Sequence, residues 1–406
     1  MAVPKNVFLI TVDCLRADFL GCINDQINFT PNIDRFAKDC LVFTRAFSTG
    51  PGTRQSFPAI LTSTYLLMHG GMRLLQGKTT LAEALRASGF WTVAFHSNPF
   101  LSKILGWGRG FNEFYDFMDE LKDPSKIVTQ LQDKGLSKKL VKTALGLFRV
   151  NRSDRVQRVL KKLYYKFTDM AIPYLDGEQL NTQVINWLKE NRRERLFLWM
   201  HYMDPHYPYI PPDEYLEDFS SRREAFIFNL DVDYKNPTEE EVEITRRLYE
   251  GEVRYVDTCF GGFIEYLGNE GFLEDSVIFL LADHGHAFME HGRFAHAYDI
   301  LYNEVINVPL LIHGLEVKGE IDRHVSLIDV PPTILDIVNI KENKDFLGKS
   351  LISQIKSDEE SRPIFSESAK PDFINLKHDV SKKLVSCIND GWKLIINELW
   401  GTTELY

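Results

Sequence analysis

The most constraining feature of the chain is a run of six apolar residues, Val277 to Ala282, that stops abruptly at Asp283-His284-Gly285. A short, unbroken apolar run is typical of a strand buried on both faces, as in a parallel sheet. In open α/β sheets, ligands bind beyond the carboxyl ends of the strands, and Gly285 lets the backbone turn away at once. The run therefore predicts a carboxylate and an imidazole at a ligand-binding edge. The simpler alternative is a strand followed by a polar turn, since Asp and Gly are common turn residues.

Two further apolar segments carry polar residues at the same point. The segment from Asn6 to Val12 has a buried-strand pattern and is followed by Asp13, while Leu196 to Met200 leads into a loop that contains Asp204 and His206. Carboxylate and imidazole together suit a divalent metal such as Zn²⁺ or Mn²⁺. Strand ends that meet at one sheet edge would bring these groups together.

A glycine-rich stretch lies between the first two of these segments. Gly50-Pro51-Gly52 is incompatible with regular structure, and the pattern from about Arg54 to Thr62 favours a helix. Thr53 then falls at a helix N-terminus, where free N–H groups and the helix dipole favour an anion. The alternative is that Thr53 simply caps the helix.

The remaining pattern alternates between strands and helices. A capping box of Thr238 and Glu241 predicts the start of a long helix that reaches about Tyr266. Other helices are expected at 31–38, where Thr30 is the expected cap, and at 80–87 and 331–340; strands are expected at 41–47, 91–95, 308–312, 363–367 and 392–396.

Composition limits the class of protein. The 406 residues are 44% apolar and 26% charged, which is ordinary for a globular chain. The net charge of -10 argues against a nucleic-acid-binding surface. The five cysteines are scattered and odd in number, which favours reduced thiols. There is no signal-peptide pattern and no run of 18 apolar residues, so we expect a cytoplasmic protein, unless an amphipathic segment holds it to a membrane.

Residues from about 118 to 195 differ from the rest, because they lack strand patterns and are rich in Lys and Arg. We expect a helical insertion here. Its basic run, residues 149–166, is most simply a solvated helix face. The alternatives are a lid over an anionic substrate or a peripheral contact with anionic lipid. We expect a catalytic domain at 1–345 and a small C-terminal subdomain at 346–406 that completes the fold.

Taken together, the ordered motifs resemble the sulfatase family of the alkaline phosphatase superfamily. They are similar to the family's first metal-ligand strand, its nucleophile helix, a substrate-binding loop, and the second ligand strand with the segments after it. In chain order the segments are Phe8–Asp18, Thr53–Thr62, His201–Tyr209, Ala282–Gly285, Glu290–Gly292, Val308–Leu310 and Ser326–Leu335.

The departures from the family pattern concern the nucleophile. Classical sulfatases carry Cys or Ser, matured to formylglycine, in a Cys/Ser-x-Pro-x-Arg pattern. Here Thr53 falls at that position, Gln55 replaces the Pro and Phe57 replaces the Arg. The family's paired Asp-Asp is Asp13-Cys14, so one ligand oxygen is missing. A Thr nucleophile is similar to the lipoteichoic-acid synthase branch, which transfers phosphoglycerol groups with one divalent ion.

The resemblance implies a mostly parallel sheet with helices on both faces, and a metal-dependent site. Asp13, Asp283, His284 and Thr53 would hold one divalent ion (Mn, Zn, Mg or Ca); a second ion is left open, with His291 or His296 as its candidate ligand. Thr53 would attack an anionic ester, and the product would pass to water or an acceptor alcohol. The other expected roles are catalytic for His206 and His296, and substrate-binding for Arg54, Asp204 and His291.

Three functions remain open at this point. A phosphoester substrate is favoured, because a Thr ester lacks the second hydroxyl with which formylglycine expels sulfate. The alternatives are a true sulfuric ester hydrolase that works without formylglycine, and a non-catalytic anion-binding protein of the same fold. The sequence makes no prediction about the oligomeric state.

Overall fold

The computed structural model describes residues 3–69, 74, 77–117, 174–341, 343–356, 362–372 and 377–406. Within these residues, nine strands form one sheet in the order β10-β2-β9-β6-β1-β5-β3-β4, with β11 paired to β2. Only β9 runs against the others, being antiparallel to both β2 and β6. The strands are β1 (Asn6–Val12), β2 (Cys40–Phe47), β3 (Trp91–His96), β4 (Glu113–Tyr115), β5 (Leu196–Tyr202), β6 (Ser276–Ala282), β9 (Asn307–His313), β10 (Gly319–Ile321) and β11 (Val325–Ser326).

The three central strands carry the site. Every residue of β1, β5 and β6 is buried, as their unbroken apolar runs predict. Their register is in step, because Val12 is paired with Tyr202 on one side and with Ala282 on the other. The chain therefore leaves all three strands at the same edge, where Asp13 and Asp283 follow.

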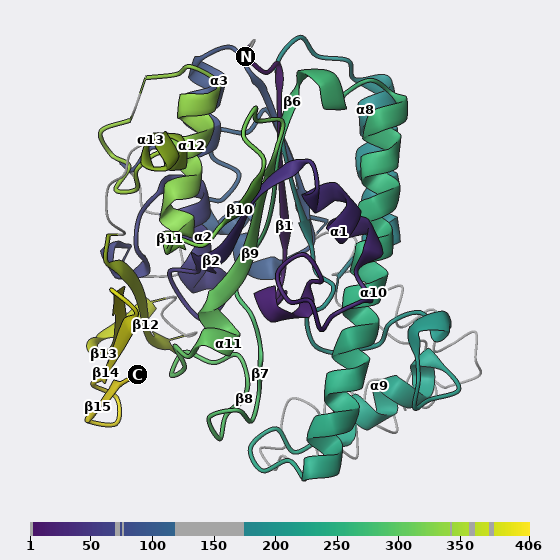
Figure 1. The fold of residues 1–406 in the computed structure, drawn as a ribbon, viewed down its shortest axis with the longest axis vertical. Helices are drawn as coiled ribbons and strands as arrows, with labels where there is room; N and C mark the ends of the chain where they lie inside the picture. The colour runs from purple at the N-terminus through teal and green to yellow at the C-terminus, as the bar shows by residue number, and fades with distance from the viewer. Residues whose placement is uncertain are drawn as a thin grey trace, which may run out of the picture.

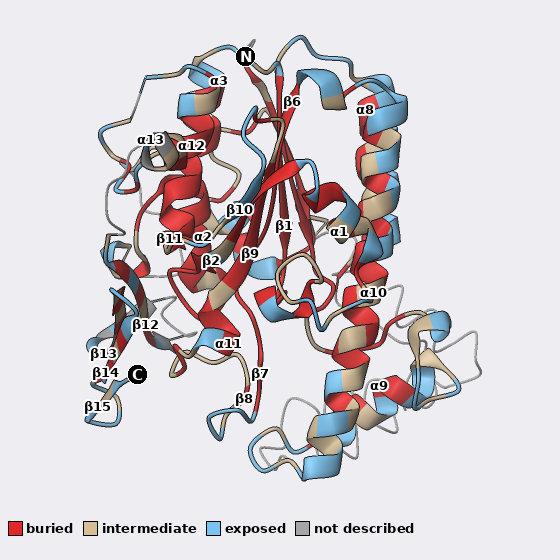
Figure 2. Cartoon of the chain, in the orientation of Figure 1, coloured by how far each residue is buried: buried red, intermediate tan, exposed pale blue. Residues whose placement is uncertain are grey.

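Helices cover both faces of the sheet (Figure 1). One group packs together on one face and the other group on the opposite face, so the core lies between each group and the sheet (Figure 2). This confirms the predicted α/β architecture with a mostly parallel sheet. The first group is α1 (Pro31–Ala37), α8 (Gly177–Glu190) and α10 (Glu239–Asn269); the second is α2 (Thr53–Thr62), α3 (Leu81–Ala87) and α12 (Val330–Ile337).

Four further elements lie around this core. They are α9 (Arg222–Asp231), α11 (Asn303–Ile306), α13 (Leu351–Lys356) and a two-stranded ribbon of β7 (Ala287–Phe288) with β8 (Phe294–Ala295).

Helix starts follow the predicted capping chemistry in part. Thr238 and Glu241 form the expected capping box at the start of α10. Thr30 stands at the N-cap of α1 but makes no side-chain capping bond. Its hydroxyl instead accepts a hydrogen bond from the Gly21 N–H and donates to Asp34.

A second, smaller sheet ends the chain. It is antiparallel, in the order β12 (Ile364–Asp372), β13 (Lys377–Asn389), β14 (Trp392–Asn397) and β15 (Thr402–Leu405). Apolar residues on its inner face, including Ile364 and Ile395, pack against Phe47, Leu301 and Ile306 of the main body. Two of its strands match the expected ones, while the domain boundary at 345/346 stays a prediction.

The expected helical insertion is only partly described. Helix α8 lies at its end, while the basic run at 149–166 lies outside the described residues. No described helix is long and apolar enough to cross a membrane. All five cysteines belong to the described residues and have free thiols, as the sequence predicts.

Candidate active site

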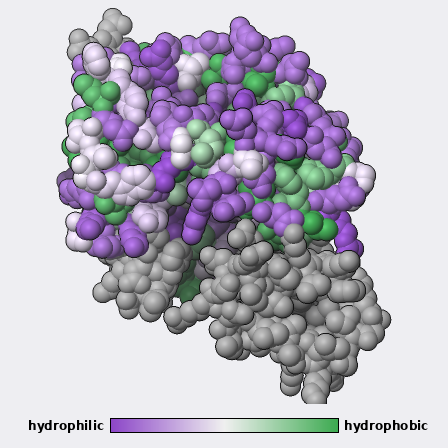
Figure 3. Space-filling model, turned by 90° about the horizontal axis from the view of Figure 1, so that it is seen from below, coloured by the Kyte–Doolittle hydropathy of each residue, from purple (hydrophilic) through white to green (hydrophobic). Residues whose placement is uncertain are grey.

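A cavity of about 380 Å³ opens at the edge where β1, β5 and β6 end. Its lining comes from the start of α2, from the loops after β3 and β5, and from the loop after β8. On the face seen from below, hydrophilic side chains predominate over the described surface, with small hydrophobic patches between them (Figure 3). Of the predicted site residues, the cavity is lined by Thr53, Arg54, His206 and His296.

Two carboxylates and an imidazole converge beside this cavity. His284 Nε2 lies 3.4 Å from Asp13 Oδ1 and 3.6 Å from Asp283 Oδ2, and all three side chains are fully buried. Among the described residues, none of these three atoms has a hydrogen-bond partner. Buried polar atoms without partners are rare and costly. These oxygen and nitrogen atoms therefore fit a divalent metal, which each could bind directly.

The tautomer of His284 is consistent with that use. Its Nδ1–H donates to the Gly285 carbonyl oxygen at 2.9 Å, which leaves Nε2 facing the Asp13 and Asp283 carboxylates. Metal-binding histidines commonly donate their other ring N–H to a carbonyl or carboxylate in this way. The glycine turn after β6 thus orients the imidazole as well as ending the strand.

The second oxygen of Asp13 is the centre of a separate hydrogen-bond network. Asp13 Oδ2 accepts from Asn98 Nδ2 at 3.0 Å and from the Thr53 hydroxyl at 3.3 Å. His201 Nε2 also lies 3.3 Å from this oxygen. One carboxylate therefore connects the unpartnered atoms to the predicted nucleophile.

The charges of these groups are strongly coupled. Burial raises the pKa of Asp13, but neighbouring histidines, led by His206, outweigh burial and hold it well below its ordinary value. Burial and the Asp13 charge raise the pKa of Asp283. Burial alone would lower the pKa of His284, yet the Asp283 and Asp13 carboxylates raise it to about 9. Both carboxylates therefore favour an additional positive charge at this point.

Thr53 is the first residue of α2, not its cap. The N-cap is Gly52, which has an extended backbone and no side chain with which to cap the helix. The prediction that Thr53 simply caps the helix is therefore wrong. The Gln55 and Ser56 N–H groups both donate to the Gly52 carbonyl oxygen, and residues at the start of α2 line the cavity, where the helix N-terminus favours an anion. Thr53 itself is only 7% exposed, and its hydroxyl also lies 3.5 Å from Asn98 Nδ2.

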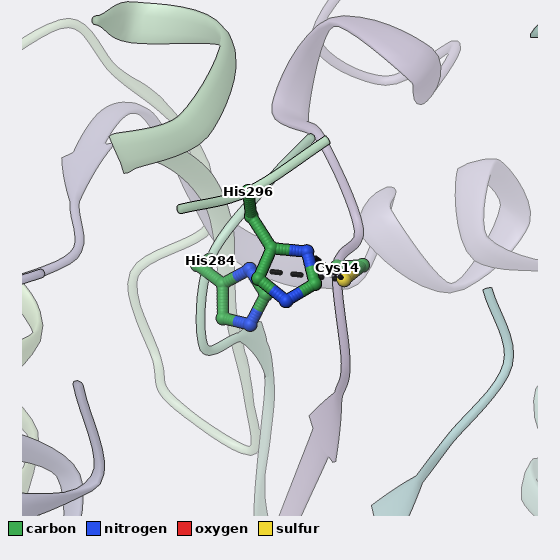
Figure 4. Close-up of side chains that lie close together, drawn as sticks. All are labelled: Cys14, His284 and His296. Atoms are coloured by element: carbon green, nitrogen blue, oxygen red, sulfur yellow. Dashed lines mark hydrogen bonds between the residues drawn. The ribbon is translucent and has the colours of Figure 1, made fainter. Parts of the chain in front are cut away.

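Cys14 occupies the position next to Asp13 with a left-handed backbone, φ 61°. Its sulfur faces two imidazoles, at 3.5 Å from His296 Nδ1 and 3.7 Å from His284 Nδ1 (Figure 4). Burial and the nearby Asp13 and Asp283 carboxylates raise the pKa of the Cys14 thiol well above its ordinary value. A protonated thiol can donate to His296 Nδ1, a bond that requires the ring proton of His296 to be on Nε2.

His206 lies in the loop after β5 and lines the cavity. Its Nδ1–H donates to the Tyr207 carbonyl oxygen at 2.6 Å, and its ring centroid lies 5.3 Å from that of His296. The Tyr174 hydroxyl donates to the His206 carbonyl oxygen at 3.0 Å, and this hydrogen bond helps to hold the loop in place. The free nitrogen of His206 is thus Nε2.

The other predicted substrate-binding residues are placed differently. Arg54 lines the cavity, where its guanidinium lies 4.5 Å from the centre of the Phe100 ring and burial lowers its pKa to about 10. Asp204 is a buried residue of the loop after β5, where burial and the Asp176 carboxylate raise its pKa to about 7. His291 pairs with Glu304 and stacks on Tyr302, and neither Asp204 nor His291 lines the cavity.

Sequence reasoning missed two members of the network, Asn98 and His201. Both carried the same signal as Asp13, a polar residue at the end of a buried strand. Asn98 follows β3, and His201 is within β5, where it is paired with His96. Their side chains reach Asp13 only because β1, β5 and β3 are neighbours in the sheet, an order that the sequence pattern does not reveal.

Comparison with known proteins identifies the family. A family model described as "Sulfatase" matches residues 5–340, which is most of the chain. The chain belongs to the sulfatase family. It is therefore an ester hydrolase of the alkaline phosphatase superfamily, and members of this family typically bind a divalent metal ion.

Individual relatives of this sulfatase-family chain are distant. An arylsulfatase of Clostridium perfringens is 24% identical, over 85% of this chain and 77% of the relative. A multifunctional alkaline phosphatase superfamily protein of Trinickia caryophylli, PehA, is 23% identical over 97% and 85% of the two chains. Among solved structures, a phosphonate monoester hydrolase from Silicibacter pomeroyi superposes with a TM-score of 0.70 at 20% identity, covering 99% of this chain and 88% of the other. The last similarity concerns the fold.

Proposed function

We propose that the protein is a metal-dependent hydrolase or transferase that cleaves a phosphate, phosphonate or sulfate ester, with Thr53 as the nucleophile and a phosphorus ester preferred. The observation that carries this proposal is the position of the Thr53 hydroxyl. It lies at the uncapped start of α2, lines the cavity and donates to Asp13 beside the unpartnered atoms of Asp283 and His284.

Asp13, Asp283 and His284 would hold the divalent ion, with the Thr53 oxygen next to it. The two carboxylates and the imidazole offer hard-to-borderline donors that suit such an ion. When bound, the ion supplies Lewis-acid stabilisation of negative charge on the nucleophile and on the group being transferred.

The chain's own residues would then position the reaction. The hydrogen bond from Thr53 to Asp13 Oδ2 holds the hydroxyl proton on the carboxylate side and leaves the oxygen lone pairs for the substrate. The start of α2, with the positive end of its helix dipole at the cavity, would stabilise the charge on the non-bridging oxygens. The Thr53 proton would pass to Asp13 Oδ2 as a new bond forms between the Thr53 oxygen and phosphorus or sulfur and the bond to the leaving alcohol breaks. A second displacement by water or an alcohol would release Thr53.

The two cavity histidines suit different roles. With the Cys14 thiol donating to its Nδ1, His296 would present its Nε2–H to an oxygen of the ester group. His206 keeps its Nδ1 proton on the Tyr207 carbonyl oxygen, so a second proton, on Nε2, would be the one that it delivers to the departing alcohol. Arg54, stacked on Phe100, would bind the substrate from the cavity wall.

A phosphorus ester is preferred because of what Thr53 lacks. Classical sulfatases use the second hydroxyl of a hydrated aldehyde to expel sulfate by elimination, and a threonine ester has none. It must be cleared by direct attack, a route that phosphoryl transfer supports well through positioning and charge stabilisation. The arylsulfatase relative favours the second candidate, sulfate ester hydrolysis without formylglycine.

A substrate panel tests the proposal. Phosphomonoester, phosphodiester, phosphonate and sulfate chromogenic esters would be assayed with added Mn²⁺, Zn²⁺, Mg²⁺ or Ca²⁺. We expect Thr53→Ala to abolish turnover, Thr53→Ser to keep part of it, and phosphorus esters to react faster than sulfate esters. Ser56→Ala is the matched control, because the Ser56 hydroxyl donates back to the Gly52 carbonyl oxygen within the helix.

Either of two results would contradict it. Full activity in Thr53→Ala would show that the nucleophile is elsewhere. Faster turnover of sulfate esters by the unmodified protein would overturn the preference for phosphorus while leaving the nucleophile in place.

A further inference from the structure

The C-terminal sheet has an outer face that the proposed reaction does not use. The sheet lies at the periphery of the molecule, and its inner face packs on the main body (Figure 1). An antiparallel sheet with one face in water normally places polar residues on that face. In β14, however, the polar residues Lys393 and Asn397 are buried on the inner face. Trp392 and Ile396 are instead exposed on the outer face, which is the pattern of a sheet that is covered on both sides.

The strand register extends this apolar surface across the whole sheet. Leu394 of β14 is paired with Leu405 of β15 and with Cys387 of β13. Cys387 is paired in turn with Phe365 of β12. Residues that are paired across neighbouring strands point to the same face of a sheet, so this row crosses all four strands. The outer apolar face consists of this row and its apolar neighbours: Phe365, Val385, Cys387, Trp392, Leu394, Ile396 and Leu405.

Charge is nearly absent from this surface. In the described part of the sheet, one charged residue belongs to the adjacent row, Glu367, which is paired with Val385. Its carboxylate accepts a hydrogen bond from the Leu67 N–H at 2.6 Å. None of the residues that form the outer apolar face is basic, so it lacks the cluster that binds anionic lipid. The centres of protein interfaces are likewise depleted of charged residues and enriched in aromatic ones, so the face suits another apolar protein surface.

The exposed area is large enough for a stable contact. Trp392 and Leu405 are 62% and 63% exposed, and Phe365 and Ile396 are each 43% exposed. At ~200 Å² for a large apolar side chain, these residues together expose about 400 Å². A standard interface buries ~800 Å² per partner, of which ~65% is apolar in homodimers. A contact centred on the outer apolar face would therefore supply most of the apolar area that a stable dimer needs.

We propose that the outer apolar face is the contact between two copies of this chain, related by a twofold axis. In such a contact the same surface meets itself, so an uncharged apolar face is its own complement. Two sheets packed face to face lie ~10 Å apart and bury both surfaces, as in a β-sandwich. The proposal concerns the C-terminal sheet and does not depend on which ester is cleaved, or on Thr53.

Sedimentation of the unmodified protein and of the double variant Trp392→Ser with Leu405→Glu measures the association. We expect the unmodified protein to be a dimer at micromolar concentration. The double variant removes a large ring and would bury a carboxylate in the contact, so its association should be at least ~100-fold weaker. Both residues are exposed, so its circular dichroism spectrum should match that of the unmodified protein. Ile104→Glu is the matched control, because Ile104 is 69% exposed and lies outside the sheet, and this variant should remain a dimer.

Cys387 reports on the same surface independently of these variants. Its thiol is free and partly exposed, and it lies in the row that crosses the sheet. We expect maleimide labelling of Cys387 to be lost at concentrations where the dimer forms, and to return on dilution and in the double variant. Mass spectrometry of the peptide that contains Cys387 measures the labelling.

Three results would overturn the proposal. They are an unmodified protein that stays monomeric, a dimer whose affinity the double variant leaves unchanged, and equal labelling of Cys387 in dimer and monomer. A monomer that binds neutral phosphatidylcholine vesicles, with binding lost in the double variant, would assign the face to a lipid surface instead and would also overturn it.

Discussion

Lys393 is a buried lysine whose charge should make the stability of the protein depend on pH. It lies on the inner face of the C-terminal sheet, is only 7% exposed, and donates from Nζ to Asn303 Oδ1 at 2.8 Å. Burial lowers its pKa from 10.5 to about 7, although the nearby Glu304 carboxylate acts in the opposite direction. The folded protein therefore gives up a proton that the unfolded chain keeps.

This difference in bound protons sets the sign of the pH dependence. Between about pH 7 and pH 10.5 the unfolded chain binds more protons at this site, so stability rises with pH through this window. Below about pH 7 both states are charged and the full cost of burial remains. At ~1.4 kcal/mol per pKa unit this cost has a ceiling of ~5 kcal/mol, which local relaxation reduces to ~2–4 kcal/mol.

Lys393→Met keeps the length of the side chain and removes its charge. We expect the variant to be ~2–4 kcal/mol more stable than the unmodified protein near pH 6, with the difference shrinking steadily toward pH 10. Thermal unfolding of both proteins at matched pH values measures this difference, and other titrating groups cancel in the comparison. A difference that is independent of pH, or a less stable variant near pH 6, would refute the account of a poorly compensated buried charge.

Three other predictions concern the site and the basic segment. Asn98→Ala removes a donor to the Asp13 carboxylate and should lower kcat/KM ~10–100-fold, as steady-state kinetics would show, because such a bond contributes ~1.5–3 kcal/mol. Asp283→Asn should lose the divalent ion and most activity with an unchanged fold; metal analysis that finds full occupancy would argue against the site. If Arg155 and Arg158 cover the substrate, reversing their charges should raise KM for a large anionic ester but not for a small one. If they contact lipid, the same change should weaken the salt-sensitive binding of the protein to anionic vesicles. No change in either assay supports a solvated helix face.

Much of the fold could be predicted because its signals are local. Unbroken apolar runs mark β1, β5 and β6, and the capping box of Thr238 and Glu241 marks the start of α10. Strand ends in a parallel sheet share an edge, so the proximity of Asp13, Asp283 and His284 could be predicted from the same runs. The basic segment, the domain boundary and the cytoplasmic location stay predictions.

The rest of the site depends on spatial order, which local patterns do not contain. His201 and Asn98 meet Asp13 because β5 and β3 follow β1 across the sheet. His291 stood in a histidine-rich loop that suggested substrate binding, yet Glu304 and Tyr302 hold it outside the cavity lining. Thr53 is a helical residue because Gly52 occupies the N-cap position of α2. Residue propensities alone do not decide which of these two neighbours caps the helix.

In the proposed reaction, Thr53 forms a covalent ester with the group being transferred. Protein quenched during turnover of a phosphorus ester would be digested and analysed by mass spectrometry, with Thr53→Ala and Ser56→Ala treated in parallel. We expect a phosphate- or phosphonate-bearing adduct on Thr53 in the unmodified protein and in Ser56→Ala, and none in Thr53→Ala. An adduct on another residue, or sustained turnover by Thr53→Ala, would contradict it.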